Sequence, residues 1–412
     1  MTDNMQSAAK SRALKSGIGS ILMISVTLGS YGSFSNYLLP LSTEFGVGIG
    51  QITLIYTIAG LAGLFASLIF SSWVKAMSVR VIVMLNGLFF AVMYILMFFS
   101  KSLGLIYAGA VMHGIATTVA AFLVAQTVIT WWFAKGAVKW MSYLSVGVGL
   151  GTMGISPVLA KCIATFGMRT TALFHGCIGG AIVVLIGATL LSDHPSKYGL
   201  QPYGYEEPKE GAAAGASAAG ASMTMKQMMS TPAFWLIAAS CLLISMAQSG
   251  FTNNASAVYQ SLGNTAATAA LVISIYSAAK MVWSIVFGQF SEKKGIAMGI
   301  IVFGAIAVVA FLCGTVLSGF AGALSIALLM GSLTFAGMLG TVAFTKVFGR
   351  KNAALAVSIG QAAMSVGAMI GAPVAGFIYD ATNTYVAYML VGAVTVALSV
   401  VAVNVAMKKK YD

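Results

Sequence analysis

Long apolar stretches separated by short polar ones run along this chain of 412 residues. A helix needs about 20 apolar residues to cross the hydrocarbon core of a bilayer, because each residue adds about 1.5 Å. Twelve stretches reach that length, at residues 17–40, 50–73, 79–100, 103–133, 138–160 and 170–192, and at residues 231–258, 266–290, 296–317, 320–345, 353–378 and 384–407. The pattern predicts an all-α membrane protein with twelve transmembrane helices.

The polar stretches divide the predicted helices into two sets of six. We expect a tail at residues 1–16, one half at 17–192, a linker at 193–229, a second half at 230–407 and a tail at 408–412. Residues 211–222 of the linker are almost all Ala, Gly and Ser, a composition typical of a flexible connection. A short helix is expected at residues 223–230, leading into the seventh span. An even number of spans places both termini on one side of the membrane.

Composition and charge placement support this organisation. Only 8% of the residues are charged, whereas soluble domains have about 25%. Of the 22 Lys and Arg residues, eighteen lie on the side of the termini, three lie on the opposite side and Lys280 lies within a span. By the positive-inside rule, the termini and the linker are cytoplasmic in a cell (inner) membrane. This placement accounts for the net charge of +13 without a nucleic-acid partner. We expect a monomer in the lipid bilayer.

The two halves repeat one another in sequence. Residues 55–60 (IYTIAG) of the second span match residues 275–280 (IYSAAK) of the eighth. The fifth and eleventh spans share a glycine and a proline, at Gly151 and Pro157 and at Gly367 and Pro373. Such internal symmetry indicates a transporter built from repeats that hold substrate between them near the membrane midplane. In this pairing Lys280 takes the place of Gly60.

Six plus six spans, a central linker and matching halves resemble the major facilitator superfamily over almost the whole chain. The signature loop of that family, Gly-x-Leu-x-Asp-Lys-x-Gly-Arg, follows the second and eighth spans. The second copy here, GQFSEKKG at residues 288–295, has Glu where the family has Asp, and the first copy is degraded. The resemblance implies a structural role for the loop residues Gly288, Glu292, Lys293, Gly295 and Arg80.

Within the superfamily, four short stretches resemble the bacterial monocarboxylate and oxalate–formate transporters. They are residues 131–133 (WWF), 197–202 (KYGLQP), 231–235 (TPAFW) and 348–349 (FG). The resemblance implies transport of small carboxylate anions by a cation in the eighth span, where this chain has Ser284 with Lys280 one turn earlier. It also places Gln361 where the oxalate carriers have a second lysine. One cation suits a monocarboxylate better than oxalate.

Lys280 is the candidate counter-charge because it lies halfway along an apolar span. A lysine at that depth costs about 2.5–3.5 kcal/mol on insertion scales. No acid is available within the spans, because all nine are expected in tails or loops: Asp3, Glu44, Asp193, Glu206, Glu207, Glu210, Glu292, Asp380 and Asp412. The substrate is therefore the expected partner of the ammonium group. The alternative is a structural lysine that reaches towards the interface or binds carbonyls of a broken helix.

Neutral polar side chains in the spans are further candidates for a pocket that binds an oxygen-rich ligand. His113 in the fourth span is a better candidate for a pocket group or proton acceptor than His175 in the sixth, although a single membrane histidine usually serves packing. The other expected substrate-binding residues are Tyr31, Asn36, Gln126, Asn253, Tyr276 and Gln361. Such groups can equally bond one helix to another.

The sequence thus predicts a transporter of a small carboxylate that works by alternating access, without cofactor or metal. Anion exchange, facilitated passage and proton symport through Lys280 or His113 all stay open. The spans hold no acid pair, metal cluster or nucleophile with its base, which argues against an intramembrane enzyme. A transporter-shaped sensor is another alternative, but it would need a fused signalling domain, and the sequence shows none. The alternative within transport is an exporter of uncharged or amphipathic compounds, with Lys280 in a structural role.

Overall fold

The computed structural model describes residues 3–205, 225–348 and 353–408, and its elements are helices. Within these ranges, twelve helical stretches are long and apolar enough to cross a membrane, which confirms the predicted class. The first six are α1 (Asp3–Ser33) with η1 (Phe34–Tyr37) and α2 (Leu38–Phe45), α3 (Ile49–Ala76), α4 (Val79–Phe99), α5 (Leu103–Ala116) with η2 (Thr117–Val124) and α6 (Ala125–Trp132), α7 (Ala137–Phe166) and α8 (Met168–Thr189).

The second set of six follows the short helices η3 (Pro195–Tyr198) and α9 (Met225–Met229). It consists of α10 (Pro232–Ser261), α11 (Ala266–Lys294), α12 (Ile296–Val316), α13 (Gly319–Met330) with η5 (Gly331–Phe335) and α14 (Ala336–Phe348), α15 (Ala353–Thr382) and α16 (Val386–Ala406). The Ala/Gly/Ser run at residues 211–222 and the last four residues of the tail lie outside the described residues.

Several helices continue past the apolar stretches that predict them, and α1 already begins at Asp3. As a result, Glu44 lies in α2, Glu292 in the last turn of α11 and Asp380 near the end of α15. The expectation that these acids lie in loops is wrong. A helix can extend into the polar layer because its backbone stays hydrogen-bonded while its side chains reach water or another polar group.

Three spans change helix type partway along, which the sequence pattern does not predict. The first span has a 3₁₀ turn at η1, the fourth has a π-helical stretch at η2 and the tenth has a 3₁₀ turn at η5. Every residue of η1 is buried. Irregular backbone inside a membrane must be covered by protein, and π-helical turns frequently mark functional sites.

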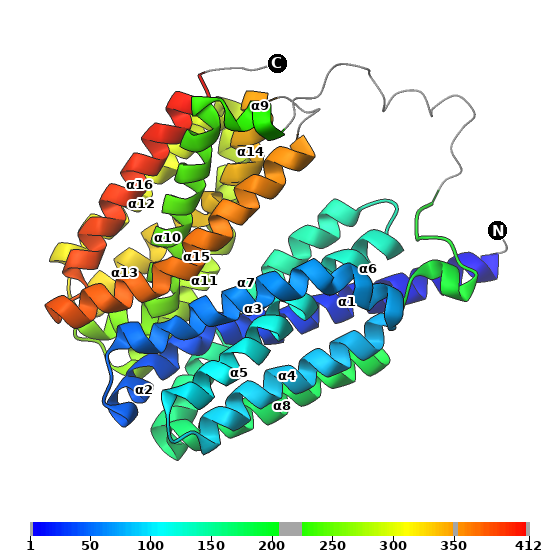
Figure 1. Ribbon diagram of the computed structural model, residues 1–412, viewed down its shortest axis with the longest axis horizontal. Coiled ribbons are helices and arrows are strands. Elements are labelled where there is room, and N and C mark those ends of the chain that lie inside the picture. Colours follow the sequence, from blue (N-terminus) through cyan, green and yellow to red (C-terminus); the bar gives the residue numbers. More distant parts are fainter. Residues whose placement is uncertain (1–2, 206–224, 349–352, 409–412) are drawn as a thin grey trace.

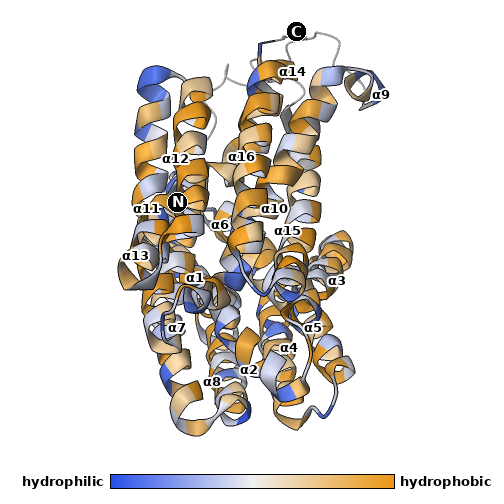
Figure 2. Cartoon of the chain, turned by 90° about the vertical axis from the view of Figure 1, so that its left-hand side faces the viewer, coloured by the Kyte–Doolittle hydropathy of each residue, from blue (hydrophilic) through white to orange (hydrophobic). Residues whose placement is uncertain are grey.

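The two halves meet at one end and diverge towards the other (Figure 1). The start of α1, the end of α16 and the described residues that follow α8 lie at the diverging end, and the turn between α2 and α3 lies at the end where the halves meet. Figure 2 shows hydrophobic residues along the length of the helices and hydrophilic residues at several helix ends. Large apolar side chains such as Phe65, Leu68 and Val316 are more than half exposed, as expected for a surface in contact with lipid.

A carboxylate joins the halves at the end where they meet. The oxygens Oδ1 and Oδ2 of Asp380 accept hydrogen bonds from the backbone N–H groups of Ile49 and Gly50, each at 2.8 Å. These amides form the first turn of α3, where unpaired N–H groups and the helix dipole favour an anion. A side chain at Gly48 would collide with the Asp380 carboxylate, and one at Gly376 would lie 2.7 Å from Gly50 Cα. We call this contact the clasp.

Two further sets of contacts between the halves lie along α3–α15 and α7–α11. Thr57 Oγ1 donates to the carbonyl of Met369 at 2.5 Å. On the other side, Ser274 Oγ donates to the carbonyl of Met153 at 2.8 Å. A second hydroxyl–carbonyl bond joins Ser156 Oγ of α7 to the carbonyl of Ala270 on α11 at 3.4 Å. Each bond of this kind contributes only about 0.5–1.5 kcal/mol net. The halves are therefore joined by contacts that can separate without unfolding either half.

Replacing Asp380 by Ala should open the clasp, because α3 loses a charged acceptor worth about 1.5–3 kcal/mol. Spin labels at Thr43 and Ala381, which are exposed on opposite halves, would report the separation by double electron–electron resonance. We expect a new population at longer distance in Asp380→Ala.

Asp193 provides a matched control, because its Oδ1 accepts from the N–H of Val79 at the start of α4 within one half. Asp193→Ala should lower thermal stability and leave the distance between the labels unchanged. An unaltered distance distribution in Asp380→Ala would show that the clasp does not hold the halves together.

Candidate functional site

Lys280 is the middle residue of α11, with fourteen helical residues on either side. Its side chain is half-buried, and Nζ lies 5.6 Å from the centroid of the Tyr276 ring, one turn earlier. Among the residues that the structure describes, the ammonium group has no hydrogen bond and no ion pair. A cation over an aromatic face gains about 0.5–2 kcal/mol, which does not replace a full counter-charge.

The position of Lys280 on its helix places it towards the centre of the molecule. Ser274 contacts α7 of the other half, and a side chain at Gly149 of α7 would meet Met281. Tyr276 contacts α10, where its hydroxyl lies 3.1 Å from Thr252 Oγ1. At 100° per residue, Lys280 falls between the face that contacts α7 and the face that contacts α10. Its ammonium therefore borders the junction of the two halves.

The 3₁₀ turn η5 packs directly against the backbone at Lys280. A Cβ atom at Gly331 would lie 3.1 Å from the Lys280 nitrogen and 3.0 Å from the Ala279 carbonyl carbon. Gln248 of α10 donates to the carbonyl of Leu333 at 3.4 Å, so the irregular turn is tied to a third helix. Broken helices of this kind form substrate sites in transporters because their free backbone groups can serve a ligand.

The half that precedes the linker has a pocket at the position that corresponds to Lys280 in the repeat. The pocket has a volume of about 160 Å³ and contains Gly60, the residue that Lys280 replaces in the sequence pairing. Helices α1, α3 and η2 line it. The lining residues are Leu28, Tyr31, Ala59, Gly60, Thr117, Thr118 and Phe122. Two threonines and one tyrosine give this mostly apolar pocket a few hydrogen-bonding groups.

Tyr31 connects this pocket to His113, which the sequence singled out. The two rings stack with centroids 5.8 Å apart and planes 10° apart. His113 is only 2% exposed, and neither of its ring nitrogens has a partner among the described residues. It therefore lies behind the pocket wall, in contact with a residue that lines the pocket.

The other expected binding residues have different positions. Asn36 is buried and donates to the Ser33 carbonyl and to Ser156 Oγ, which ties α1 to α7. Asn253 is buried and donates to Ser249 Oγ on its own helix. Gln126 on α6 and Gln361 on α15 are both exposed. The structure thus brings Lys280 together with Tyr276, and Tyr31 together with His113.

The residues of the signature loop lie at helix ends. Glu292 and Lys293 are exposed in the last turn of α11, and Gly295 has φ +87, a backbone conformation that favours glycine. A side chain at Gly288 would meet no other atom within 4 Å. In the degraded first copy, Arg80 Nε donates to the Leu191 carbonyl at 2.7 Å.

Asp193 restores an acid near this degraded loop, which sequence reasoning missed. It accepts from the Val79 N–H at 2.7 Å and lies 3.3 Å from Lys197 Nζ. The acid comes from the segment after α8 rather than from the loop after α3. The stretch KYGLQP at residues 197–202 could have directed attention to this segment, because it begins four residues later.

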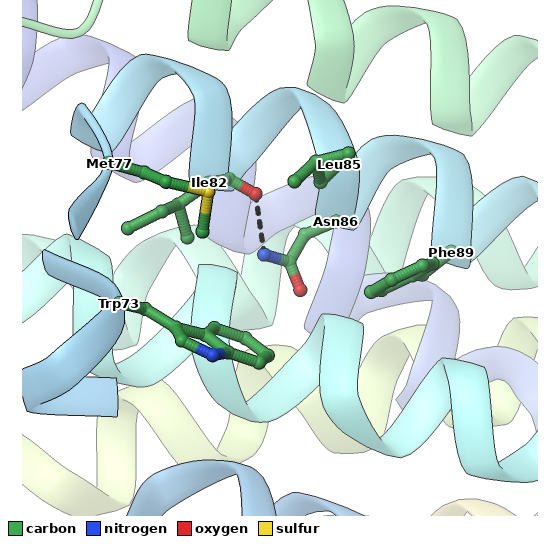
Figure 3. Close-up of a pocket in the computed structure, with 6 residues that line it drawn as sticks. All are labelled: Trp73, Met77, Ile82, Leu85, Asn86 and Phe89. Carbon is green, nitrogen blue, oxygen red and sulfur yellow. Dashed lines mark hydrogen bonds between the residues drawn. The ribbon is translucent and has the colours of Figure 1, made fainter. Parts of the chain in front are cut away.

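A larger pocket of about 200 Å³ lies where α3 ends and α4 begins (Figure 3). Its lining is Trp73, Met77, Ile82, Leu85, Asn86 and Phe89. The one amide, Asn86, donates to the Ile82 carbonyl at 2.6 Å. No charged side chain lines this pocket, so it offers nothing for an anion and is less suited to the predicted chemistry than the region around Lys280.

Comparison with known proteins identifies a family over most of the chain. The model of the Major Facilitator Superfamily matches residues 19–345 and 243–410. The chain is similar to the uncharacterized MFS-type transporter YhjX of Escherichia coli (strain K12), with 22% identity over 279 residues. That match covers 67% of this chain and 65% of the relative's length.

Solved transporters share the fold. A bacterial homologue of the human lysosomal transporter Spinster, inward-facing and unoccupied, has a TM-score of 0.71 at 14% identity, covering 99% of this chain and 98% of that one. The nucleoside transporter NupG also has a TM-score of 0.71, at 15% identity, covering 97% and 100%. At these identities the likeness describes the fold and leaves the ligand of this chain open.

The packing of η5 against α11 gives a testable consequence. Gly331→Ala should lower the thermal stability by about 1–3 kcal/mol and lower transport, because the new methyl group would push η5 away from Lys280. Gly337→Ala in the same span is the matched control, since nothing lies within 4 Å of a Cβ atom there. Thermal unfolding of the two purified variants would measure the difference, and equal melting temperatures would contradict close packing at Gly331.

Proposed function

Because this chain belongs to the Major Facilitator Superfamily and is a multi-pass membrane transporter, we propose that it carries a small monocarboxylate with Lys280 as the counter-charge. One observation carries the proposal: the ammonium group lies at the middle of a membrane span without a hydrogen bond or ion pair to the described residues. A carboxylate would supply the missing charge. Ionisable groups inside membrane spans are costly and mark substrate pathways.

The groups around Lys280 suit a small oxygen-rich anion. Tyr276 and Thr252 place two hydroxyls beside each other, one turn from the lysine. Gln248 and the turn η5 add amide and backbone groups at the same helix junction. These are neutral donors and acceptors, so they can orient a carboxylate without competing for the ammonium charge.

The contacts between the halves fit alternating access around this site. The clasp, the Thr57–Met369 bond and the Ser274–Met153 bond all come from residues that precede Gly60 on α3 and Lys280 on α11. We infer from the basic residues that the termini are cytoplasmic in the cell membrane, so the diverging end faces the cytoplasm. Transport then requires the halves to separate at the clasp and approach one another at the other end.

An exporter of uncharged or amphipathic compounds is the alternative, and it needs a structural role for Lys280. A structural lysine would bind carbonyl oxygens or an acid of the protein. Three acids of the described residues have partners away from Lys280: Glu44 pairs with Arg169, Asp193 with Lys197 and Asp380 with the start of α3. The absence of a described partner for Lys280 therefore favours the anion carrier.

A thermal-shift screen of the purified protein with formate, acetate, lactate and oxalate tests the proposal. A ligand at 100 times its Kd stabilises the folded protein by about 2.7 kcal/mol. We expect one monocarboxylate to raise the melting temperature of the wild type and to have no effect on Lys280→Gln. Lys293→Gln is the control, because Lys293 is exposed in the last turn of the same helix.

A response to an acid that persists in Lys280→Gln would place the anion elsewhere. Stabilisation by none of the four acids, together with stabilisation by an amphipathic compound, would establish the exporter instead.

Gln361 on α15 can be tested as a site residue by thiol labelling. Gln361 and Ser365 form an exposed polar face, whereas Val366 and Ile370 are exposed and apolar on an adjacent face that suits lipid. In a background without the four native cysteines, the acid found in the screen should slow labelling of Gln361→Cys by a maleimide. Labelling of Val366→Cys should not change. Equal rates for Gln361→Cys with and without the acid would remove this residue from the site.

A further inference from the structure

A second titratable cluster lies in the half that precedes the linker, and the anion site does not use it. His113 on α5 and His175 on α8 flank the ring of Tyr94 on α4. The ring centroids of Tyr94 and His175 are 4.4 Å apart, and those of Tyr94 and His113 are 5.8 Å apart. Phe90 contacts both imidazoles at 5.6 and 5.9 Å. We call His113, Tyr94 and His175 the imidazole cluster.

The cluster contains hydrogen-bonding atoms that have no partner. Both ring nitrogens of His113 and the hydroxyl of Tyr94 are buried and unpaired among the described residues. Buried polar atoms are nearly always paired, so three unpaired atoms in one cluster call for an explanation. A neutral imidazole has one nitrogen with a free lone pair, which is the group that accepts a proton.

The two hydroxyl contacts of His175 suit both the neutral and the protonated imidazole. Its Nε2 lies 2.8 Å from Ser30 Oγ, and its Nδ1 lies 3.3 Å from the hydroxyl of Tyr37. A hydroxyl can donate or accept, so rotation of the hydroxyl hydrogens serves either tautomer of the neutral ring. A protonated ring would donate to both hydroxyls. Adding a proton therefore requires no movement of heavy atoms.

The cluster is connected to the pocket that corresponds to Lys280. Tyr31 lines that pocket and stacks on His113. Thr117 also lines the pocket, and its Oγ1 donates to the backbone carbonyl of His113 at 2.9 Å. The π-helical stretch η2 begins four residues after His113. A change in the charge of His113 would thus act on Tyr31 and Thr117, which line this pocket.

No described carboxylate contacts the cluster. The titratable groups that face it are the tyrosines at 31, 37 and 56, and Cys162 faces Tyr37. The charged residues on the surrounding helices have no described contact with the cluster and comprise Asp3, Lys10, Arg12, Lys15, Glu44, Lys75, Arg80, Lys139, Lys161 and Arg169. Imidazole is the one side chain in this set that ordinarily changes charge between pH 5 and 8. A pH-dependent step here therefore belongs to the histidines.

We propose that the imidazole cluster binds the proton that accompanies the carboxylate, which makes the protein a proton symporter. The inference rests on the carboxylate function proposed above. The proton comes from water on the side to which the site is open, is held on an imidazole nitrogen and returns to water on the other side. One proton and one monocarboxylate carry no net charge. A potential of 100 mV, negative inside, would otherwise exclude a monovalent anion about fiftyfold.

The experiment uses the full chain in liposomes that contain a pH-sensitive dye. The acid is the one among formate, acetate, lactate and oxalate that gives the largest thermal shift. In the wild type, adding this acid outside should acidify the interior faster than in protein-free liposomes. With the outside one pH unit more acidic, the initial uptake of the acid should be faster than in protein-free liposomes, which the neutral acid enters only by diffusion.

Exchange of labelled for unlabelled acid at equal pH needs no net proton movement. It therefore tests the carboxylate site at Lys280 separately from the imidazole cluster. The double variant His113→Gln, His175→Gln should retain exchange while its initial rate of proton-driven uptake falls to that of protein-free liposomes. Tyr94→Phe keeps the ring and removes the unpaired hydroxyl, and it should slow proton-driven uptake with exchange retained. His194→Gln is the control, because His194 is exposed and bonds Ser196 after α8.

Transport of the acid by the wild type without proton movement would overturn the symport inference and leave the carboxylate function intact. A wild-type rate of proton-driven uptake in both the double histidine variant and Tyr94→Phe would also overturn it. Wild-type protein that exchanges none of the four acids would overturn the carboxylate function and the inference with it. If the double variant does not fold, Tyr94→Phe alone decides, because its packing is preserved.

Discussion

Backbone N–H and C=O groups inside the hydrocarbon layer must find partners within the protein, because no water reaches them there. This constraint makes every span a helix, and it restricts irregular backbone to places that protein covers. The three departures from regular helix lie at such places. η1 contributes Tyr37 to the contacts of His175, η2 borders the pocket at Gly60, and η5 packs against Lys280. The irregular turns and the polar groups of the interior therefore occur together.

The same low dielectric determines where charges lie. At helix ends, Arg169 is paired with Glu44, and Asp380 is paired with the first turn of α3. Lys280 is different, because it lies in the middle of α11 without a described partner. The protein thus bears the cost of a half-buried charge within a span, at the junction of its halves. An anionic substrate would offset that cost each time it binds.

The contacts that join the halves are close but of few types: glycine packing, hydrogen bonds to one carboxylate and hydroxyl–carbonyl bonds. Glycines at positions 48, 50 and 376 let α3 and α15 approach closely, and the Asp380 carboxylate closes the gap with two hydrogen bonds. Within each half, by contrast, large apolar side chains such as Phe90, Phe251 and Phe311 are fully buried. A rigid half with a separable seam is the arrangement that rocking motions require.

The sequence alone determined the twelve spans, the two halves and the depth of Lys280, because bilayer thickness and the exclusion of charge act on each stretch of chain separately. It could not place Asp380 against α3 or His175 beside Tyr94, since each of these contacts joins helices that are far apart in the chain. It also left open whether Asn36 and Asn253 line a site or tie helices together. Only the tertiary structure decided these points, because side chains at equivalent depths in different spans meet or miss according to how the helices rotate and cross.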